Sequence, residues 1–420
     1  MVDLTTDYAG LTLRNPIVSA ASSLGNHVDK LVRLQRAGAG AVTTKLISSA
    51  VQPPEHEFPY RCAVARGGWM LNGDPNLPQD YGVQLVKAAK KALKIPVIAN
   101  FVGVEANVDA WVQNALALQK AGADALEMDL YCPMSGLGTH IDEHGDSGHG
   151  YTSICAFPKE LGQVMRALKD ACKIPVIPKM NPTVMSITAV ASALIENGAT
   201  TLTMSNCMEG NPGVDIYDGG KSLIKFRNTG NGVPYQGAFL FPMHSRNLVV
   251  LKDTYGDRIR VISGGGIYTW EEMVQRFMLG AHSIQLASAL IMNGLGVIKK
   301  SLDGLQNYLE HYGHKSLDDI RGISLKAAAV GRAHVSLDPA VAQIRDPMRC
   351  LPCADKCVEK VSADCLALSM GAHGVPSIDA TKCTGCAWCT HHCGSDAIEL
   401  VRTQKHVDIW NIKSELTGAA

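Results

Sequence analysis

Short apolar runs alternate with longer amphipathic stretches along the first 300 residues. Eight of the runs are rich in β-branched residues and end in small or polar ones: NPIVSAAS, GAVTTKL, IPVIANFVG, ALEMDLYCP, IPVIPKMNP, TTLTMSN, IRVISGGG and HSIQLAS. Between them, segments such as 108–123 and 158–173 carry apolar residues at helical spacing. Eight strand–helix repeats predict a (β/α)8 TIM barrel, with functional groups at the carboxyl ends of the strands. The alternative is a doubly wound open sheet, which the count of eight and the lack of a glycine-rich turn after the first strand disfavour.

Composition and charge indicate the number of domains and exclude some classes of partner. With 420 residues, 46% of them hydrophobic, the chain can bury the core of one large domain and a smaller one. Lys plus Arg and Asp plus Glu both number 39, so we expect no broad attraction to nucleic acid or to an anionic membrane. The chain carries no signal-peptide pattern and no apolar run near the roughly 20 residues that span a bilayer. We therefore expect a cytoplasmic protein with no membrane or nucleic-acid partner.

The cysteines are unevenly distributed. Of the 13, eight fall between Cys350 and Cys393, and the other five are scattered through the preceding residues. Disulfides are rare in a reducing compartment, so the dense group predicts metal ligands. We therefore expect a barrel in residues 1–300, a helical connection in 301–345 and a small cysteine-rich domain in 346–420. Segments 51–80 and 207–236 are too long for ordinary connections and are expected to form lids or cofactor-covering loops.

The spacing within the cysteine-rich segment is typical of a ferredoxin. Its second half has the pattern C-x2-C-x2-C-x3-C, in which three thiolates hold one cubane cluster and the fourth crosses to another. The crossing rule assigns one cluster to Cys350, Cys353, Cys357 and Cys393, and the other to Cys365, Cys383, Cys386 and Cys389. Two zinc sites are the alternative, but zinc ligands come as two separated pairs. The sequence thus predicts a ferredoxin-like domain with two [4Fe-4S] clusters, although Gly394 stands where a ferredoxin usually has proline.

A glycine-rich stretch supplies a candidate cofactor site. Gly264–Gly266 follow a strand and precede a helix, and the next strand ends at Ser288, so backbone amides can approach a phosphate there. No G-x-G-x-x-G follows a strand, so the chain is not expected to bind a dinucleotide. A flavin mononucleotide fits, because a flavin exchanges a hydride for the single electrons that clusters carry. Lys45 and Lys179, at two strand ends, suit the negative charge of a reduced flavin, although each can equally be a solvated cap.

These motifs, in this order, resemble a known family. The barrel resembles the dihydroorotate dehydrogenase superfamily. Barrel and tail together are similar to the catalytic subunits of bacterial NAD-dependent dihydropyrimidine dehydrogenases. The motifs that carry the resemblance are GLTLRNPIVSAAS, TTKL, IPVIANFVG, DLYCP, IPVIPKMNP, MSN, GAFLFP, ISGGGI and the cysteine-rich tail. The resemblance implies an FMN and iron–sulfur oxidoreductase that reduces or forms an activated C=C bond in a pyrimidine such as uracil or thymine. It also implies an oligomer that exchanges electrons with a separate NAD(P)-linked FAD flavoprotein.

The resemblance further implies roles for individual residues. The implied FMN-binding residues are Ala21, Ser22, Lys45, Asn100, Lys179, Asn206, Gly237, Gly265, Gly266 and Ser288. Cys132, at the end of the fourth strand, would protonate one carbon of the double bond while the flavin delivers hydride to its neighbour. A free cysteine titrates near pH 8.5 and is therefore mostly protonated at neutral pH. The alternatives are a small buried hydrophobe at Cys132 and a catalytic role for Cys155, which precedes a helix.

The residues around Cys132 depart from the family pattern. The family motif reads Asn-Leu-Ser-Cys-Pro, whereas this chain has Asp129, Tyr131 and Met134 at positions that face the substrate in relatives. An ionised carboxylate only accepts hydrogen bonds, so a non-pyrimidine substrate is an alternative. An electron-transfer subunit without its own substrate is another. In the following loop, His140, His144 and His149 fit no standard metal-ligand spacing, and a solvated lid is favoured over a metal site.

Overall fold

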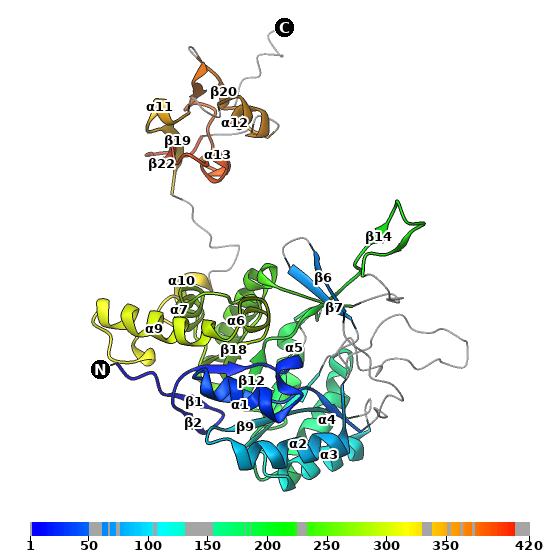
Figure 1. Ribbon diagram of the computed structural model, residues 1–420. Coiled ribbons are helices and arrows are strands. Elements are labelled where there is room, and N and C mark those ends of the chain that lie inside the picture. The colour runs from blue at the N-terminus through cyan, green and yellow to red at the C-terminus, as the bar shows by residue number, and fades with distance from the viewer. Residues whose placement is uncertain are drawn as a thin grey trace. The chain divides into compact units, whose positions relative to one another are not determined.

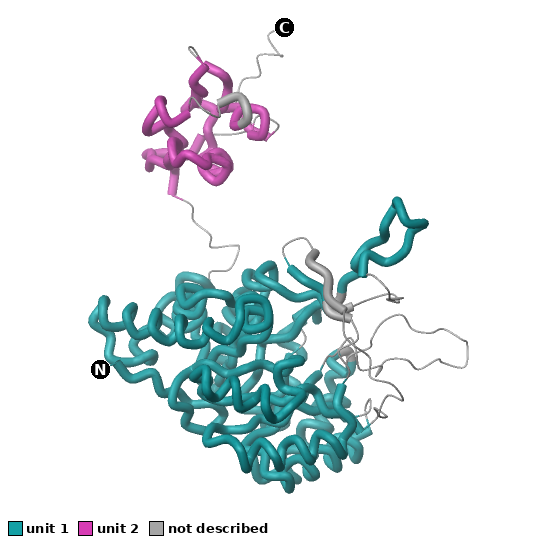
Figure 2. The backbone as a smooth tube through the Cα atoms, viewed as in Figure 1, with its two compact units in different colours: residues 1–329 teal, residues 330–420 magenta. Residues whose placement is uncertain are grey.

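A computed structural model describes most of the chain. The described residues are 2–49, 61–65, 68–72, 76–103, 107–130, 154–180, 182–184, 186–224, 233–329, 338–350, 354–361, 364–371 and 374–407. The chain forms two compact units, residues 1–329 and residues 330–420 (Figure 2). Among the described residues, no helix is both long and apolar enough to cross a membrane.

The larger unit is built on a closed barrel of parallel strands (Figure 1). In barrel order the strands are β3 (Ile17–Ser19), β4 (Ala41–Thr43), β9 (Val97–Val102), β10 (Ala125–Asp129), β11 (Val176–Lys179), β12 (Thr201–Met204), β17 (Arg260–Ser263) and β18 (Ser283–Leu286). Pairing of β18 with β3 closes the ring. Each strand lies within one of the eight apolar runs, so the prediction of a TIM barrel is confirmed and the open sheet is wrong.

Helices surround the barrel and cover its outer face (Figure 1). They are α1 (Val28–Arg36), α2 (Gln79–Ala92), α3 (Val108–Lys120), α4 (Pro158–Ala171), α5 (Ile187–Glu196), α6 (Phe241–Tyr255), α7 (Trp270–Met278), α8 (Ser288–Asn293), α9 (Gly296–His311) and α10 (Leu325–Ala328). The short 3-10 helices are η1 (Ser23–Gly25), η2 (Ile154–Ala156), η3 (Ala238–Leu240), η4 (Gly256–Arg258) and η5 (Leu317–Asp319). Helix α3 is representative: Asn107 caps its first turn, and Trp111, Ala115 and Leu118 form its buried stripe at helical spacing.

An N-terminal hairpin fills the amino end of the barrel. Strands β1 (Thr6–Tyr8) and β2 (Leu11–Leu13) pair antiparallel, and Tyr8 and Leu13 are fully buried. They join a core group with six barrel residues: Val18, Ala41, Ile98, Ala125, Ile177 and Ile262. This apolar layer closes one end of the barrel, so polar groups are accommodated further along the strands.

The two long insertions come together in a separate sheet. Strands β6 (Arg61–Ala65), β7 (Gly68–Asn72), β16 (Val233–Gln236) and β13 (Met208–Gly210) form an antiparallel sheet in which β7 pairs with β16. Two short hairpin strands, β14 (Val214–Asp215) and β15 (Lys221–Ser222), extend from it. Strand β5 (Ile47–Ser48) pairs with β9, and β8 (Leu77–Pro78) pairs with β5. The described parts of segments 51–80 and 207–236 are therefore largely strands. Their pairing spans more than 160 residues of sequence, and no local pattern indicates it.

The smaller unit is a compact arrangement of two hairpin-like pairs and short helices. Strand β19 (Ala340–Ile344) pairs with β22 (Ile398–Arg402), and β20 (Leu368–Met370) pairs with β21 (Pro376–Ile378). The helices are α11 (Pro347–Cys350), α12 (Ala354–Val361) and α13 (Trp388–His392). The core is small and includes the thiols of Cys383 and Cys389 beside a few aliphatic side chains. Small domains that bury little apolar surface gain stability from a metal or disulfide staple.

Candidate active site

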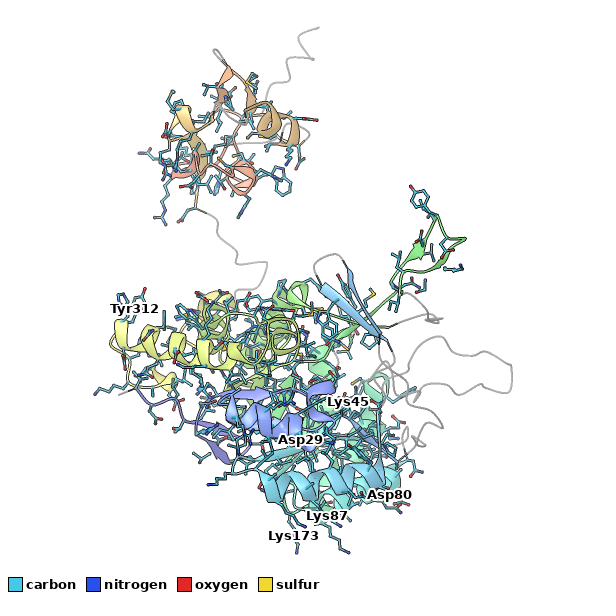
Figure 3. The ribbon with its side chains drawn as sticks, viewed as in Figure 1. Asp29, Lys45, Asp80, Lys87, Lys173 and Tyr312 are labelled. Carbon is cyan, nitrogen blue, oxygen red and sulfur yellow. The ribbon has the colours of Figure 1, made fainter. Side chains whose placement is uncertain are left out.

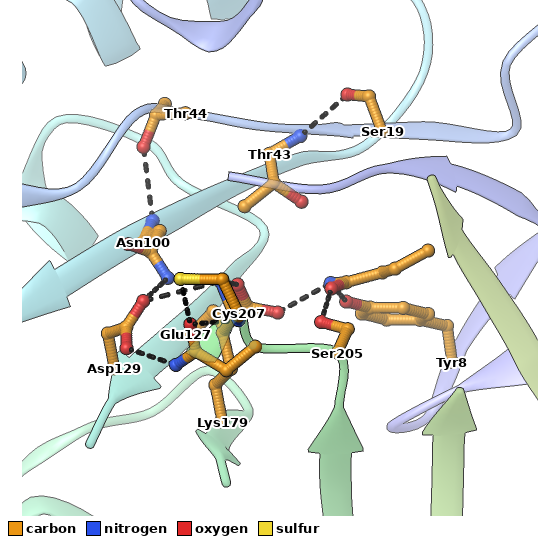
Figure 4. Close-up of polar contacts among 12 residues, drawn as sticks. Tyr8, Ser19, Thr43, Thr44, Asn100, Glu127, Asp129, Lys179, Ser205 and Cys207 are labelled. Carbon is orange, nitrogen blue, oxygen red and sulfur yellow. Dashed lines mark hydrogen bonds and ion pairs between the residues drawn. The ribbon is translucent and has the colours of Figure 1, made fainter. Parts of the chain in front are cut away.

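Polar side chains converge at the carboxyl ends of the barrel strands. Asn100 on β9, Asp129 on β10, Lys179 at the end of β11 and Asn206 after β12 are all buried. Figure 4 shows Asn100, Asp129 and Lys179 close together. Lys45, labelled in Figure 3, is also buried and lies where the chain leaves β4. Strands of a parallel barrel point the same way, so residues distant in sequence meet at this end. Five of the residues proposed from sequence therefore lie in one region.

Asp129 is held by donors from three other strands. Its Oδ2 accepts a hydrogen bond from Asn100 Nδ2 at 3.2 Å, and its Oδ1 accepts one from Asn206 Nδ2 at 3.0 Å. Lys179 Nζ lies 3.3 Å from Oδ2. The carboxylate is thus oriented by two amides and paired with a buried cation.

Glu127 is a second buried acid in the same network. It lies two residues before Asp129 on β10, so both side chains point to the same face of the strand. Glu127 accepts hydrogen bonds from Asn100 Nδ2 at 2.9 Å and from Gln285 Nε2 at 2.5 Å, and lies 3.9 Å from Lys179 Nζ. Gln285 also donates to Tyr8 Oη at 3.2 Å, which connects the network to the barrel floor. Sequence reasoning missed Glu127, although its two-residue spacing from Asp129 was a usable signal.

Burial sets the charge states in this network. Desolvation raises the pKa of Glu127, and the nearby Lys179 ammonium offsets this only in part. Burial alone would lower the pKa of Lys179, but the Asp129 and Glu127 carboxylates outweigh it and raise that pKa above its ordinary value. Lys179 therefore stays protonated at neutral pH.

A pocket opens beside this network. Its lining residues are Ala20, Ser205, Asn206, Cys207, Gln236, Leu240, Gly265, Gly266, Ile267, Gln285, Leu286, Ala287 and Ser288. Gly265 and Gly266 have φ of +73° and +79°, and a Cβ on them would collide with the His244 ring and the Phe241 backbone respectively. Only glycine therefore permits this close approach of the backbone. Gly265, Gly266 and Ser288, proposed from sequence as part of the phosphate region, all line this one pocket.

His244 and Arg276, which sequence reasoning missed, brace the glycine turn. Burial, together with the Arg276 charge, lowers the pKa of His244 to about 3, so its ring is neutral. Its Nε2 bonds to the Asn206 carbonyl oxygen at 2.9 Å. Arg276 Nη2 donates to the carbonyl oxygens of Gly265 at 3.0 Å and Phe241 at 2.9 Å. These contacts tie the turn to α6 and α7.

Other residues proposed from sequence lie nearby or outside the described residues. Ser22 caps η1 by accepting from Leu24 N, beside Ala21, and Gly237 precedes η3 with φ of +142°. Cys155 is only 5% exposed and packs in the main apolar core, which favours a structural role. The remaining site candidates lie outside the described residues: Tyr131, Cys132, Met134, His140, His144 and His149.

The smaller unit gathers thiols around one cavity. The cavity is lined by one complete set of cysteines assigned from spacing: Cys365, Cys383, Cys386 and Cys389. The Ala342 amide donates to Cys383 Sγ at 3.2 Å. Among the described residues, no three His, Cys, Asp or Glu side chains are placed to hold a single metal ion. Four thiols around a common cavity are nevertheless the donor set of a cubane cluster.

The second cysteine set is described only in part. Cys350 is buried, Cys357 and Cys393 are half-buried, and Cys353 lies outside the described residues. Ala397 N donates to Cys393 Sγ at 3.1 Å. Within this set, a backbone amide donor is therefore shown for Cys393.

The donor set of the barrel fits a flavin mononucleotide. The glycine turn lines the pocket with backbone, as phosphate sites do, and two buried lysines lie at strand ends. Asn100 Oδ1 is buried and has no hydrogen-bond partner among the described residues, as expected of an acceptor that serves a ligand. Fold and site together define a TIM-barrel protein with a glycine-lined pocket at the carboxyl ends of its strands.

Comparison with known proteins identifies the family. Residues 3–309 match the family model for dihydroorotate dehydrogenase, and the chain belongs to this family. It is 30% identical over 322 residues to the catalytic subunit of dihydroorotate dehydrogenase B (NAD(+)) from Methanocella arvoryzae, covering 76% of this chain and 97% of that protein. The corresponding subunit from Pyrococcus abyssi is 28% identical over 325 residues, covering 77% of this chain and 99% of that protein.

Family membership confirms the broader predictions from sequence. The chain is a flavin-dependent oxidoreductase of a family that uses FMN and acts on a CH–CH bond of a pyrimidine-like substrate. The narrower resemblance to dihydropyrimidine dehydrogenase and the iron–sulfur clusters stay predictions.

Proposed function

We propose that this chain is the catalytic subunit of an FMN and iron–sulfur enzyme of the dihydropyrimidine dehydrogenase type. It reduces, or in reverse forms, the activated C=C bond of a small cyclic substrate such as uracil or thymine. The observation that carries the proposal is the pocket at the strand ends, whose wall residue Asn206 is hydrogen-bonded to the Asp129–Lys179 ion pair. A phosphate pocket next to a buried cation is the arrangement that an FMN-dependent reduction requires.

In this proposal, one group of residues binds the FMN phosphate and another group contacts the rest of the cofactor. Gly237, Gly265, Gly266 and Ser288 hold the phosphate, and Ala21, Ser22, Lys45, Asn100, Lys179 and Asn206 contact the rest of the cofactor. Arg276 and His244 keep the glycine turn in place through their contacts with Gly265 and Asn206. Bound FMN supplies hydride transfer and exchanges electron pairs for single electrons.

Cys132 moves the proton in this scheme. In the sequence it follows Asp129, the last residue of β10, by three positions, and the carboxyl ends of the strands carry the catalytic groups in TIM barrels. The thiol gives its proton to the carbon next to the one that receives hydride. Asp129, Tyr131 and Met134 contact the substrate from the same segment.

The tail carries electrons to a second protein. The proposed ligand sets are Cys350, Cys353, Cys357 and Cys393 for one [4Fe-4S] cluster, and Cys365, Cys383, Cys386 and Cys389 for the other. The second set is supported by the cavity that its four thiols line. The partner is a separate NAD(P)-linked FAD flavoprotein, and the relatives' name, catalytic subunit of an NAD(+) enzyme, supports such a division of labour. The enzyme would be a cytoplasmic oligomer.

Two alternative functions can be distinguished from the proposed one by experiment. The first is the same chemistry on a non-pyrimidine substrate, which the carboxylate of Asp129 favours, since it accepts hydrogen bonds where an amide would also donate. The second is an electron-transfer subunit without its own substrate.

The test is substrate reduction by reduced viologen with wild type and Cys132→Ala. We expect turnover of uracil or thymine by wild type and a loss of about 100-fold or more in the variant. Turnover of orotate or of another ene substrate alone would replace the proposed substrate. Absence of turnover with every ene substrate, in protein that contains FMN and iron, would favour the electron-transfer subunit.

A further inference from the structure

Lys179 is a buried cation that faces two buried carboxylates. Its side chain is 5% exposed, that of Asp129 5% and that of Glu127 0%, and the distances from Nζ are 3.3 Å and 3.9 Å. The interaction is strong because water screens it little at this depth. The positive charge of Lys179 is therefore largely compensated before any ligand binds.

Asp129 is the stronger of the two counter-charges. It is closer to Nζ, and amides of Asn100 and Asn206 fix its orientation. Figure 4 shows the contact with Asn100. Glu127 is deeper, and its raised pKa means that it carries its negative charge less readily. The pair also borders the pocket, because Asn206 is both a wall residue and a donor to Asp129.

We propose that Asp129 is a positioning residue that compensates the charge of Lys179 and thereby lowers the reduction potential of the bound flavin. The inference rests on the proposed function, since it requires FMN beside Lys179. Uptake of two electrons and one proton adds one negative charge to a flavin ring, and an uncompensated lysine would stabilise that charge. With Asp129 paired to it, Lys179 stabilises the reduced form less, so the flavin is a stronger reductant.

The low potential has a functional consequence in this chain. A flavin that gives up electrons readily favours reduction of the substrate's double bond over its formation. Asp129 thus shifts the half-reaction between flavin and substrate toward reduced substrate, and this role differs from a direct contact with the substrate.

The experiment measures the midpoint potential of FMN in the full-length, FMN-loaded protein by spectroelectrochemistry at constant pH. Asp129→Asn keeps the size of the side chain and removes the charge. We expect a shift to a less negative potential, corresponding to at least a tenfold change in the ratio of reduced to oxidised flavin, or about 30 mV for a two-electron couple. Glu127→Gln should shift the potential in the same direction by less.

The matched control is Asp303→Asn, which breaks an exposed Lys299–Asp303 ion pair of 2.6 Å on α9 and should leave the potential unchanged. In a Lys179→Met background, Asp129→Asn should raise the potential by less, because an unpaired buried carboxylate carries its negative charge less readily. Asp129→Ser serves if the asparagine variant does not accumulate, and FMN content and melting temperature verify the fold of each variant.

The outcomes separate the inference from the proposed function. Wild-type protein that binds no FMN would refute the proposed function. Wild type and Asp129→Asn that bind FMN with equal potentials would refute only the inference. An Asp129→Asn variant with a raised KM for the substrate and an unchanged flavin potential would also refute the inference. That result would assign Asp129 to substrate binding.

Discussion

Gly265 combines two constraints that can be separated by mutation. Its φ is +73°, and a Cβ there would collide with the ring of His244. Gly313 has the same φ of +73° but has no atom within 4 Å of the added Cβ. The pair therefore distinguishes backbone strain, which both positions share, from loss of space beside the pocket.

We expect Gly265→Ala to weaken FMN binding at least tenfold and Gly313→Ala to leave it unchanged. Both should lose about 1 kcal/mol of stability from the left-handed backbone, and Gly265→Ala should lose more because the buried His244 must move. FMN affinity is measured by fluorescence titration and stability by urea unfolding. Equal FMN affinity of the two variants would contradict the role of this turn in the phosphate pocket.

His282 makes the barrel sensitive to acid. Burial, reinforced by the charges of Arg321, Lys252 and Arg260, lowers its pKa to about 3. An unfolded histidine titrates near pH 6.5, so below that pH the unfolded state binds the proton first. Stability is complete above about pH 6.5 and is lost as the pH falls toward 3, at up to about 1.4 kcal/mol per pH unit.

We expect His282→Asn to reduce this pH dependence by the contribution of one proton. The measurement is the free energy of unfolding in urea across the range from pH 7 to pH 4. His311→Asn, on the exposed surface of α9, is the control and should keep the wild-type slope. An unchanged slope in His282→Asn would show that other groups cause the acid sensitivity.

At the scale of elements, local sequence accounts for most of the barrel. Each of the eight strands follows from a short apolar run, and α3 and α4 follow from apolar residues at helical spacing. The hairpin β1–β2 and the sheet that joins β7 to β16 were not predicted. Strands β7 and β16 have no pattern of their own and become strands only when the distant partner satisfies their backbones, so tertiary contacts decide them.

Helix α7 begins with a capping box close to the glycine turn of the pocket. Thr269 Oγ1 accepts from Glu272 N at 3.3 Å and Glu272 Oε2 accepts from Thr269 N at 3.0 Å, which is a capping box directly after the glycine turn. Thr269→Ala should cost about 1 kcal/mol of stability in urea unfolding. Thr254→Ala, which removes only an exposed hydroxyl bond to Val250 O on α6, should stay within about 0.5 kcal/mol. Equal effects of the two substitutions would contradict a stabilising cap at α7.

At the scale of the whole molecule, barrel and tail are expected to bind their cofactors independently. They form separate compact units, and the family match ends at residue 309, before the cysteine-rich segment. Cys386→Ser should remove about half of the iron, because it breaks one of two clusters, and should leave FMN content unchanged. Cys172→Ser, which replaces a half-buried thiol of the barrel, should change neither.

Iron and FMN are measured on the same preparations by elemental analysis and absorbance. An iron content of Cys386→Ser equal to that of wild type would exclude this residue as a ligand. A colourless protein that contains zinc would overturn the assignment of the tail to iron–sulfur clusters.

By itself, the sequence determined the barrel, the glycine turn at its seventh strand and the grouping of eight cysteines, because periodicity and spacing are local properties of the chain. Only the tertiary structure decided which side chains face one another inside the barrel. Glu127 meets Gln285 because closure of the ring brings the distant strands β10 and β18 to one axis, and Asp129 meets Lys179 because β10 and β11 pair in this register. Burial there then sets their charges, and burial is a property of the folded barrel, not of any one segment.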